Sequence, residues 1–342
     1  MMQHRLNKAL TVLWLALLGW LAYSLLRWGL WHAVWSPNLA ACTALQGQGA
    51  CWGVIAEKGR VMLLGRYPLA QQWRAIAVVV LWTGWVFAAL LGWLHGRWLW
   101  CSGAALPAAL LWFMHGGAGL PVVSSTLWGG LPLTLLISGV GFAGAFPLAV
   151  GLALGRRSRL RPIRWACTVY IEVLRALPLV SVLFLAAFVL PKYMSGSWLE
   201  PDLFARVTFT IALFSAAYLA EVVRGGLQAV PRHQAESARA LGLTAWQVQH
   251  WVVLPQALHV AMPGVVNSFV TLFKECSLVS IVALFELTGA LGLALSGDLH
   301  WRAFYLEGYV FIALIYWVYC FGLSKAVEYR QAVFGAFASV GR

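Results

Sequence analysis

The chain has 342 residues, of which 61% are hydrophobic and only 10% are charged, and its mean hydropathy is +0.78. A water-soluble domain of this length cannot bury so much apolar surface, so the composition excludes a soluble protein and predicts one that is solvated by lipid. The formal net charge of +13 would suit a nucleic-acid partner, but the Lys and Arg residues lie mostly in loops between apolar segments. This distribution indicates membrane topology, and we therefore expect an all-α polytopic membrane protein that contacts lipid and no nucleic acid.

About eight apolar segments are long enough to cross a bilayer, since a transmembrane helix needs roughly 20 apolar residues. The first follows the basic residues Arg5 and Lys8 and is too long for the apolar part of a signal peptide, so we interpret it as a span. The predicted spans are residues 9–26, 75–94, 98–114, 131–154, 167–190, 204–227, 259–284 and 305–325.

Loop charge predicts the orientation of these spans. If the amino terminus is cytoplasmic, the arginine cluster at 156–164 and the stretch 231–256 both lie on the cytoplasmic side, as the positive-inside rule requires. The polar loop that holds Cys42 and Cys51 then lies outside, in an oxidising compartment that permits a disulfide between them. Two unpaired thiols are the alternative.

A shift in composition near Gly129 divides the chain. The first three predicted spans carry almost no ionisable residues, whereas the last five contain Glu172, Glu221 and Lys274 in or near their apolar runs. We expect an extension at 1–128, with three spans and a periplasmic loop, and a functional core at 129–342.

Between the sixth and seventh predicted spans the apolar pattern stops. Pro231 ends the preceding helix because it lacks an N–H, residues 234–241 form a short helix rich in Ala, and Gly242 supplies the turn that ends it. Thr244 is a good N-cap for a second short helix, which we expect to end before Pro255. Two short helices joined by a sharp turn form a knob that a soluble partner can grip.

This segment resembles the EAA loop of ABC importer permeases in the spacing of Glu236, Ser237, Ala238, Gly242, Val252, Leu254 and Pro255. It departs from the family by Ser237 in place of Ala and Val252 in place of Ile. Four further features resemble the polar amino acid branch of that family. They are the string AYLAEVVRGGLQAVP at 217–231, the string LPLTLLISG at 131–139, the pair Arg175 and Pro178, and the string LFKECSLVSI at 272–281. In the last string, KECSL replaces the family's usual KDTSL.

The resemblance implies a permease core made of the last five predicted spans, in a bacterial inner membrane, that imports amino acids. It also implies partners: a dimer of ABC ATPase subunits that binds ATP and Mg, a second homologous permease subunit in a heterodimer, and a periplasmic amino-acid-binding protein. The three added spans are similar to those of a general L-amino-acid permease. The coupling residues that it implies are Gln234, Glu236, Ser237, Ala238, Arg239, Gly242, Leu254 and Pro255.

The chain itself contains no GxxxxGK[ST] string, so it has no loop to cradle ATP phosphates. We therefore expect a transport subunit without enzymatic activity, cofactor, metal site or catalytic residue of its own. The histidines are dispersed, and no cysteine spacing suits a metal.

Ionisable groups at membrane depth are the candidates for the substrate path, since a zwitterionic amino acid needs polar partners there. Glu221 is the first choice: it lies three residues from both Tyr218 and Arg224 and could meet the substrate ammonium or a basic side chain. An ion pair with Arg224 is the structural alternative. Tyr218, on a similar face of the same helix, is also assigned to the path.

Four further residues are assigned to the path, each with a structural alternative. Thr134 and Ser138, one helical turn apart, could donate to a substrate carboxylate or bond their own backbone. Lys274, with its neighbour Glu275, could border the path or lock helices together, and Ser277 could help either role. Glu172 and Arg175 are three apart and are predicted to form a structural ion pair.

The main alternative function is a secondary transporter driven by an ion gradient, which would not need a docking knob and would show inverted repeats. A membrane enzyme would bring acid and base side chains together near one face, and a channel would need repeated polar rings. The sequence shows no inverted repeats and no convincing acid–base cluster, and a channel would have no use for the EAA-like segment.

Overall fold

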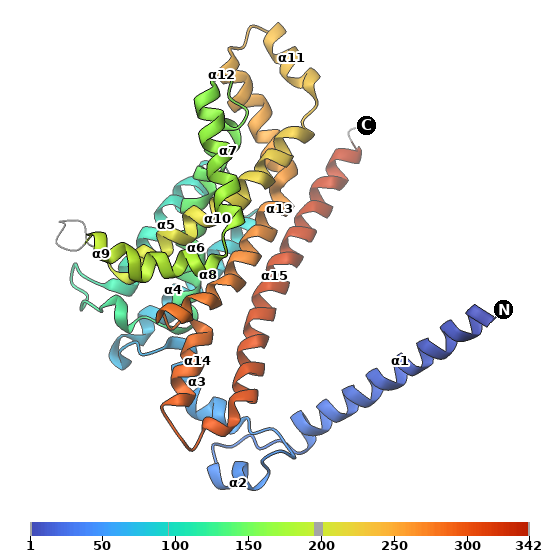
Figure 1. The fold of residues 1–342 in the computed structure, drawn as a ribbon, viewed down its shortest axis with the longest axis vertical. Coiled ribbons are helices and arrows are strands. Elements are labelled where there is room, and N and C mark those ends of the chain that lie inside the picture. Colours follow the sequence, from blue (N-terminus) through green and yellow to red (C-terminus); the bar gives the residue numbers. More distant parts are fainter. Residues whose placement is uncertain (1, 95, 195–200, 341–342) are drawn as a thin grey trace. The chain divides into compact units, whose positions relative to one another are not determined.

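The computed structural model describes residues 2–94, 96–194 and 201–340, and all regular secondary structure in these ranges is helical (Figure 1). The described chain forms two compact units. One contains the residues up to Met62 together with Leu291–Leu314, and the other contains Leu63–Ala290 together with the chain after Leu314. Each is described by itself below; the predicted boundary between 128 and 129 stays a prediction.

The first unit begins with the long apolar helix α1 (Met2–Leu26), which ends in a π-helical turn (Arg27–Trp31). It continues with the short helix α2 (Leu39–Ala44) and most of α3 (Gly53–Leu64). Asn38 caps α2 by accepting a hydrogen bond from the Ala41 N–H, as is common at helix starts. The unit also holds the end of α14 (Leu287–Ser296), a short 3₁₀ helix (Arg302–Phe304) and the start of α15 (Tyr305–Val340).

Cys42 and Cys51, the predicted pair, form a disulfide in this unit, with their Cα atoms 5.4 Å apart. The backbone N–H of Cys51 donates to Oε1 of the buried Glu307 at 3.0 Å, which ties the loop to the first turn of α15. Lys58 Nζ lies 2.8 Å from Asp298 Oδ2 and lowers the pKa of that carboxyl by its hydrogen bond. The loop after α1 and the segment between α14 and α15 are therefore fastened together at several points.

Replacing both Cys42 and Cys51 by serine is expected to lower the free energy of unfolding of this unit by about 2–3 kcal/mol, because the bridge closes a short loop of the unfolded chain. Thermal unfolding of the purified protein in detergent measures the change. The control is Cys101→Ser, which alters an exposed free thiol. An equal loss in the control would mean that the bridge contributes nothing specific.

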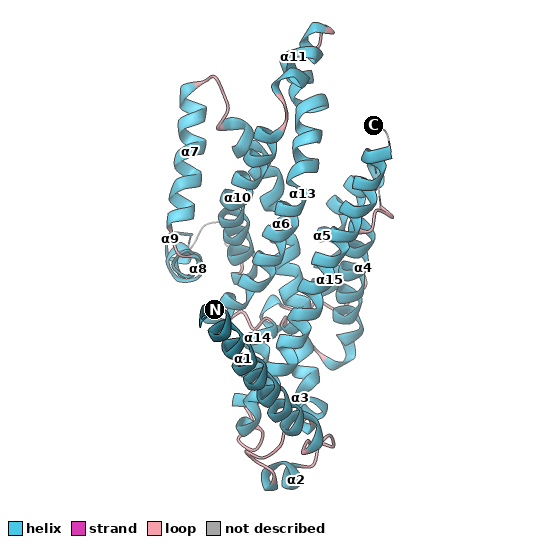
Figure 2. Ribbon diagram, turned by 90° about the vertical axis from the view of Figure 1, so that its right-hand side faces the viewer, coloured by secondary structure: helices cyan, strands magenta, loops and turns pink. Residues whose placement is uncertain are grey.

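The second unit contains the remaining helices. Three of them, α6, α10 and α13, pack together through small side chains, which let helix backbones approach closely in a membrane (Figures 1 and 2). The bounds are α4 (Gln72–Leu90), α5 (Arg97–His115), α6 (Gly130–Gly155), α7 (Arg161–Ala176), α8 (Leu179–Phe184), α9 (Leu190–Met194), α10 (Leu203–Ala229), α11 (Arg232–Ala240), α12 (Ala245–Gln247) and α13 (Leu254–Glu275).

The prediction of an all-α polytopic membrane protein is confirmed, with a difference in the number of spans. Among the described residues, six helices are long and apolar enough to cross a membrane, or seven if the bent pair α7 with α8–α9 counts as one. The third predicted span forms the helix α5 but is not among them. Its tryptophans and its terminal Arg97 and His115 lower its mean hydropathy.

The predicted span at 167–190 is not one continuous helix. The chain bends by 102° between α7 and the segment Leu179–Met194, so α8 and α9 cross the direction of α7 (Figure 2). The cause is Pro178, which disfavours the helical conformation of the residue before it; Leu177 is extended, with φ −86° and ψ 142°. α7 also begins earlier than predicted, at Arg161.

The expected helix end before Pro255 is wrong as well. The helix that begins at Ala245 passes through a π-helical segment (Val248–Val253) directly into α13. Pro255 stands in the first turn of α13, where the missing N–H is tolerated, and the wide π turn leaves room for its ring. The second short helix is thus the first part of a longer helix that continues into α13, rather than a separate element.

Candidate functional site

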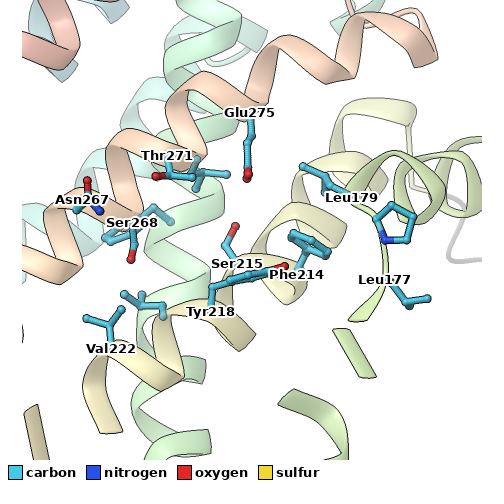
Figure 3. Close-up of a pocket in the computed structure, with 14 residues that line it drawn as sticks. Leu177, Leu179, Phe214, Ser215, Tyr218, Val222, Asn267, Ser268, Thr271 and Glu275 are labelled. Atoms are coloured by element: carbon cyan, nitrogen blue, oxygen red, sulfur yellow. The ribbon is translucent and has the colours of Figure 1, made fainter. Parts of the chain in front are cut away.

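A cavity of about 370 Å³ opens among α6, α10, α13 and the bend between α7 and α8 (Figure 3). This volume is within the range of small-molecule sites. Its lining residues are Phe142, Leu177, Pro178, Leu179, Phe214, Ser215, Tyr218, Leu219, Val222, Asn267, Ser268, Thr271, Leu272 and Glu275.

One wall of the cavity is polar. Asn267, Ser268, Thr271 and Glu275 follow one another along α13 at helical spacing, so their side chains share a face (Figure 3). Ser268 Oγ donates to the Gly264 carbonyl oxygen at 2.8 Å. This face offers amide and hydroxyl groups together with one carboxylate, a set that can hold a polar ligand carrying a positive group.

The opposite wall comes from α10 and α6 and is mostly aromatic. Phe214 and Tyr218 lie one turn apart on α10, with ring centroids 5.3 Å from each other, and Phe142 adds a ring from α6. Ser215 is the polar residue between them (Figure 3). Of the residues assigned to the substrate path, Tyr218 is the one that lines this cavity.

Glu221 lies one turn beyond Tyr218 and faces a cluster of arginines instead. Arg224 donates to Glu221 Oε2 through Nη2 at 2.7 Å and Nε at 2.9 Å, and Arg156 Nη1 donates to Oε1. Arg175 Nη1 is 3.9 Å from Oε2. The ion pair with Arg224, the structural alternative of the sequence, is therefore present within a larger network.

The predicted ion pair between Glu172 and Arg175 is wrong in its partners. Arg156, at the end of α6, pairs with Glu172 through Nη2 at 2.8 Å, because its two guanidinium nitrogens reach a carboxylate on each neighbouring helix. Arg175 instead stacks over the Tyr218 ring at 5.7 Å and approaches Glu221, while the Tyr218 hydroxyl donates to the Arg175 carbonyl oxygen at 3.3 Å. Arg175 and Tyr218 thus connect the cavity wall to the arginine cluster.

Thr134 and Ser138 do not line the cavity. Both are fully buried, and Ser138 Oγ donates to the Thr134 carbonyl oxygen at 2.8 Å, so the backbone-bonded alternative describes it. The Thr134 hydroxyl accepts from the Leu287 N–H at 3.0 Å and lies 3.4 Å from Glu286 Oε2. Both side chains are occupied by the fold and have no access to a solute.

Lys274 and Ser277 are also outside the cavity lining. Lys274 is exposed on α13, one position before the lining residue Glu275, and therefore points to a different side of the helix. Ser277 is half-buried in the 3₁₀ segment Cys276–Val282, where its carbonyl oxygen accepts from Ser280 Oγ at 2.8 Å.

Glu286 is a buried carboxylate that the sequence analysis did not single out. Its Oε1 accepts from the N–H groups of Thr288 and Gly289, both at 2.9 Å, at the start of α14. Its Oε2 accepts from the Tyr316 hydroxyl at 2.9 Å. The carboxylate is fully satisfied by the protein and stabilises the start of a helix, which gives it a structural role.

The predicted coupling loop, residues 231–256 and called the coupling segment below, has the expected short helix, α11, and the expected turn. Gly242 has a φ of +84°, which glycine adopts without strain and other residues rarely do. Thr244 forms a full capping box with Gln247, as its place before the second helix predicts. α11 projects beyond the ends of α10 and α13 (Figure 1).

Ala238 anchors this segment to the membrane helices. It is buried in one apolar cluster with Ala153 of α6, Val223 and Leu227 of α10, and Ala257 of α13. Other predicted coupling residues present a surface: Glu236, Ser237, Arg239 and Pro255 are exposed, whereas Gln234 and Leu254 are half-buried. Leu241 is 84% exposed at the tip, next to the turn at Gly242.

Glu275 had been considered for the substrate path beside Lys274, and it lines the cavity. Asn267, Ser268 and Thr271 were missed, although the sequence held a signal for them. An amide, two hydroxyls and a carboxylate recur at positions 267, 268, 271 and 275 of an otherwise apolar segment, on one helical face. Ser215 gave no such signal, because a lone serine in an apolar helix usually bonds its own backbone.

Comparison with known proteins agrees with this architecture. Residues 145–329 match the family described as binding-protein-dependent transport system inner membrane component. The chain is 40% identical to the inner membrane amino-acid ABC transporter permease protein YhdY of Escherichia coli K12, over 96% of this chain and 89% of that protein. It is 33% identical to the glutamate/glutamine/aspartate/asparagine transport system permease protein BztC of Rhodobacter capsulatus, over 95% of this chain and 90% of that protein.

A solved structure, described as the crystal structure of an amino acid ABC transporter with histidines, is also similar. It aligns with a TM-score of 0.53 and 30% identity and covers 59% of this chain and 91% of that chain. These similarities favour a permease subunit over a secondary transporter and over an enzyme. The chain belongs to the binding-protein-dependent transport system inner membrane component family, the membrane-spanning permease subunits of ABC importers.

Proposed function

We propose that this permease forms the path of an amino acid importer and that the cavity between α10 and α13 is its substrate site. One observation carries the proposal: the coupling segment connects the two helices that line the cavity. α10 ends at Ala229, α11 and α12 follow, and α13 begins at Leu254. A partner that moves α11 therefore moves both cavity walls through covalent connections and through the apolar cluster around Ala238.

The cavity chemistry suits an amino acid. Glu275 supplies a negative charge for an ammonium group, and the Asn267 amide and Thr271 hydroxyl can donate to a carboxylate. The similar proteins named above include transporters of amino acids. Tyr218 lines the cavity and contacts Arg175, which approaches Glu221, so the arginine cluster adjoins the cavity wall. Roles for Glu221, Lys274 and Ser277 in the path remain predictions.

The family operates with ATPase and substrate-binding partners. We propose that an ATPase dimer, which binds ATP and Mg, docks on the exposed residues of α11 and on Leu241. We further propose that a second, homologous permease completes a heterodimer, that a periplasmic protein delivers the amino acid, and that the amino terminus of this inner-membrane chain is cytoplasmic. The arginines near the end of α6, at the same end of the unit as the coupling segment, support this orientation.

The function is tested by ATP hydrolysis of the complex assembled from this chain, its ATPase, its permease partner and the binding protein in proteoliposomes. Hydrolysis is expected to rise several-fold when a cognate amino acid and the binding protein are both present. Hydrolysis that is indifferent to every amino acid and to the binding protein would exclude an amino acid importer.

The docking surface is tested separately by Leu241→Asp, which places a charge on the most exposed apolar side chain of the coupling segment. Co-purification of the ATPase is expected to fall by about tenfold, as for the loss of an apolar interface anchor. The control is Val122→Asp, which places the same charge on another exposed apolar side chain, 66% exposed, in the loop before α6. ATPase capture that survives the first change, or is lost equally in the second, would exclude Leu241 from the interface.

A further inference from the structure

Helix α4, part of the sequence that precedes the permease core, packs behind the cavity. Its Trp82 is only 3% exposed, and its ring lies 5.6 Å from that of Phe269 on α13 and 6.5 Å from that of Tyr319 on α15. One residue on, the Thr83 and Tyr319 hydroxyls are hydrogen-bonded at 2.9 Å. α4 is therefore fixed to α13 and α15 and does not merely lie in lipid beside them.

The contact continues to the cavity wall. Phe269 is 8% exposed and meets the Phe142 ring edge-to-face, with centroids 5.2 Å apart. Phe142 lines the cavity, and Phe269 lies on α13 between the lining residues Ser268 and Thr271. A row of three rings, Trp82, Phe269 and Phe142, thus leads from α4 to the cavity.

Trp82 also packs against a glycine of α6. A Cβ atom at Gly139 of α6 would lie 2.2 Å from Trp82 Nε1, so the indole occupies the space that any other residue at 139 would need. The indole therefore packs against both the α6 backbone and Phe269. Packed interiors transmit such a constraint, because no void is available to absorb a shift.

We propose that Trp82 is a positioning residue for the cavity: it sets the distance between α13 and α6, and so the width of the site and the place of its polar face. The geometry predicts that two substitutions change the width of the cavity in opposite directions. Removing the indole leaves a space behind Phe269 into which α13 can relax, and the cavity widens. Adding a methyl group at Gly139 pushes the indole toward Phe269, and the cavity narrows. The inference rests on the proposed function only in treating this cavity as the substrate site.

The test uses the purified full chain carrying Thr271→Cys, an exposed cavity-lining position, with the four free cysteines replaced by alanine. The rate of reaction with a hydrophilic maleimide reports access to the cavity and needs no substrate. Trp82→Ala is expected to raise this rate, and Gly139→Ala to lower it, each by about threefold to tenfold, the range of an aromatic contact. Trp82→Phe, which keeps a ring, is expected to restore most of the parent rate.

Trp85→Ala is the matched control. Trp85 lies on the same helix, but its indole N–H donates to Ser102 Oγ of α5 at 2.9 Å, and its ring lies against Gly103 of α5. Trp85→Ala removes a side chain of the same size as Trp82→Ala does, and it should leave the rate of maleimide labelling unchanged. Equal rates in Trp82→Ala and the parent, a change of the same sign in Gly139→Ala, or an equal change in Trp85→Ala would each overturn the proposal. If Trp82→Ala cannot be purified, Gly139→Ala and Trp82→Phe carry the same test.

Binding of radiolabelled amino acid to the assembled complex, without the binding protein, distinguishes this inference from the proposed function. Weakening by about tenfold in Trp82→Ala, with unchanged binding in Trp85→Ala, supports both. No binding by the parent complex, together with labelling rates of the expected signs, would reject the cavity as substrate site and retain the positioning role of Trp82.

Discussion

Gly226→Ala is expected to destabilise the protein by about 1–3 kcal/mol, whereas the same change at the neighbouring Gly225 is expected to stabilise it by about 0.5–1 kcal/mol. A Cβ atom at Gly226 would lie 2.3 Å from the Ala257 carbonyl oxygen and 2.8 Å from the Ala261 Cβ, so α10 and α13 would have to separate. Gly225 is exposed, with nothing within 4 Å of such an atom, and alanine there reduces only the entropy of the unfolded chain.

Unfolding of the two variants in mixed micelles measures these opposite effects. Gly226 lies beside the apolar cluster that holds the coupling segment to α10 and α13, so ATP hydrolysis by the assembled complex should fall with Gly226→Ala and stay unchanged with Gly225→Ala. If Gly226→Ala stabilised the protein instead, α10 and α13 would not approach each other as closely as they do in the structure.

Glu221→Gln is expected to destabilise the protein by about 2 kcal/mol, between the loss of an exposed ion pair and the loss of one partner of a buried one, because Glu221 and its arginines are partly exposed. Glu221 is 18% exposed in its side chain and is the carboxylate that Arg156, Arg224 and Arg175 share. Without its charge the three guanidinium groups repel one another at the junction of α6, α7 and α10.

The control is Glu172→Gln. This carboxylate is 56% exposed in its side chain and pairs with Arg156, an arrangement whose loss costs at most about 1 kcal/mol. Thermal unfolding in detergent compares the two variants, and a second change, Arg156→Gln in the Glu221→Gln background, should restore part of the stability. Equal losses at Glu172 and Glu221, or a double variant weaker than the single one, would show that the network is not centred on Glu221.

The sequence predicted the coupling segment well because its signals are local. Pro231, Gly242 and Thr244 act through their own backbone geometry, and each has the predicted role at the boundary of a short helix. Pro255 shows the limit of that reasoning, since a proline ends a helix only if no first-turn position or π turn accommodates it.

The cavity could be predicted only in part. The spacing of the polar residues of α13 predicts that they share one helical face. The other residues of the cavity, Ser215 and Tyr218 on α10 and the bend at Pro178, join that face only because segments far apart in the chain pack together. The charge pairs could likewise be predicted only in part. Glu221 has Arg224 nearby in sequence, whereas its other partner, Arg156, is 65 positions away. Arg156 also pairs with Glu172, and Arg175 approaches Glu221 instead. Spacing along one helix identifies neighbours on that helix and says nothing about neighbours on another.

By itself, the sequence determined that this is a polytopic helical membrane protein with a short helical segment bounded by Pro231 and turned at Gly242, because hydropathy and backbone restrictions act within one segment. Only the tertiary structure decided which polar groups share a cavity, that Thr134 and Ser138 are occupied by the fold, and that Trp82 fills the space left by Gly139. The reason is physical: burial and charge pairing are properties of the space between helices, and that space is defined only once the helices have packed.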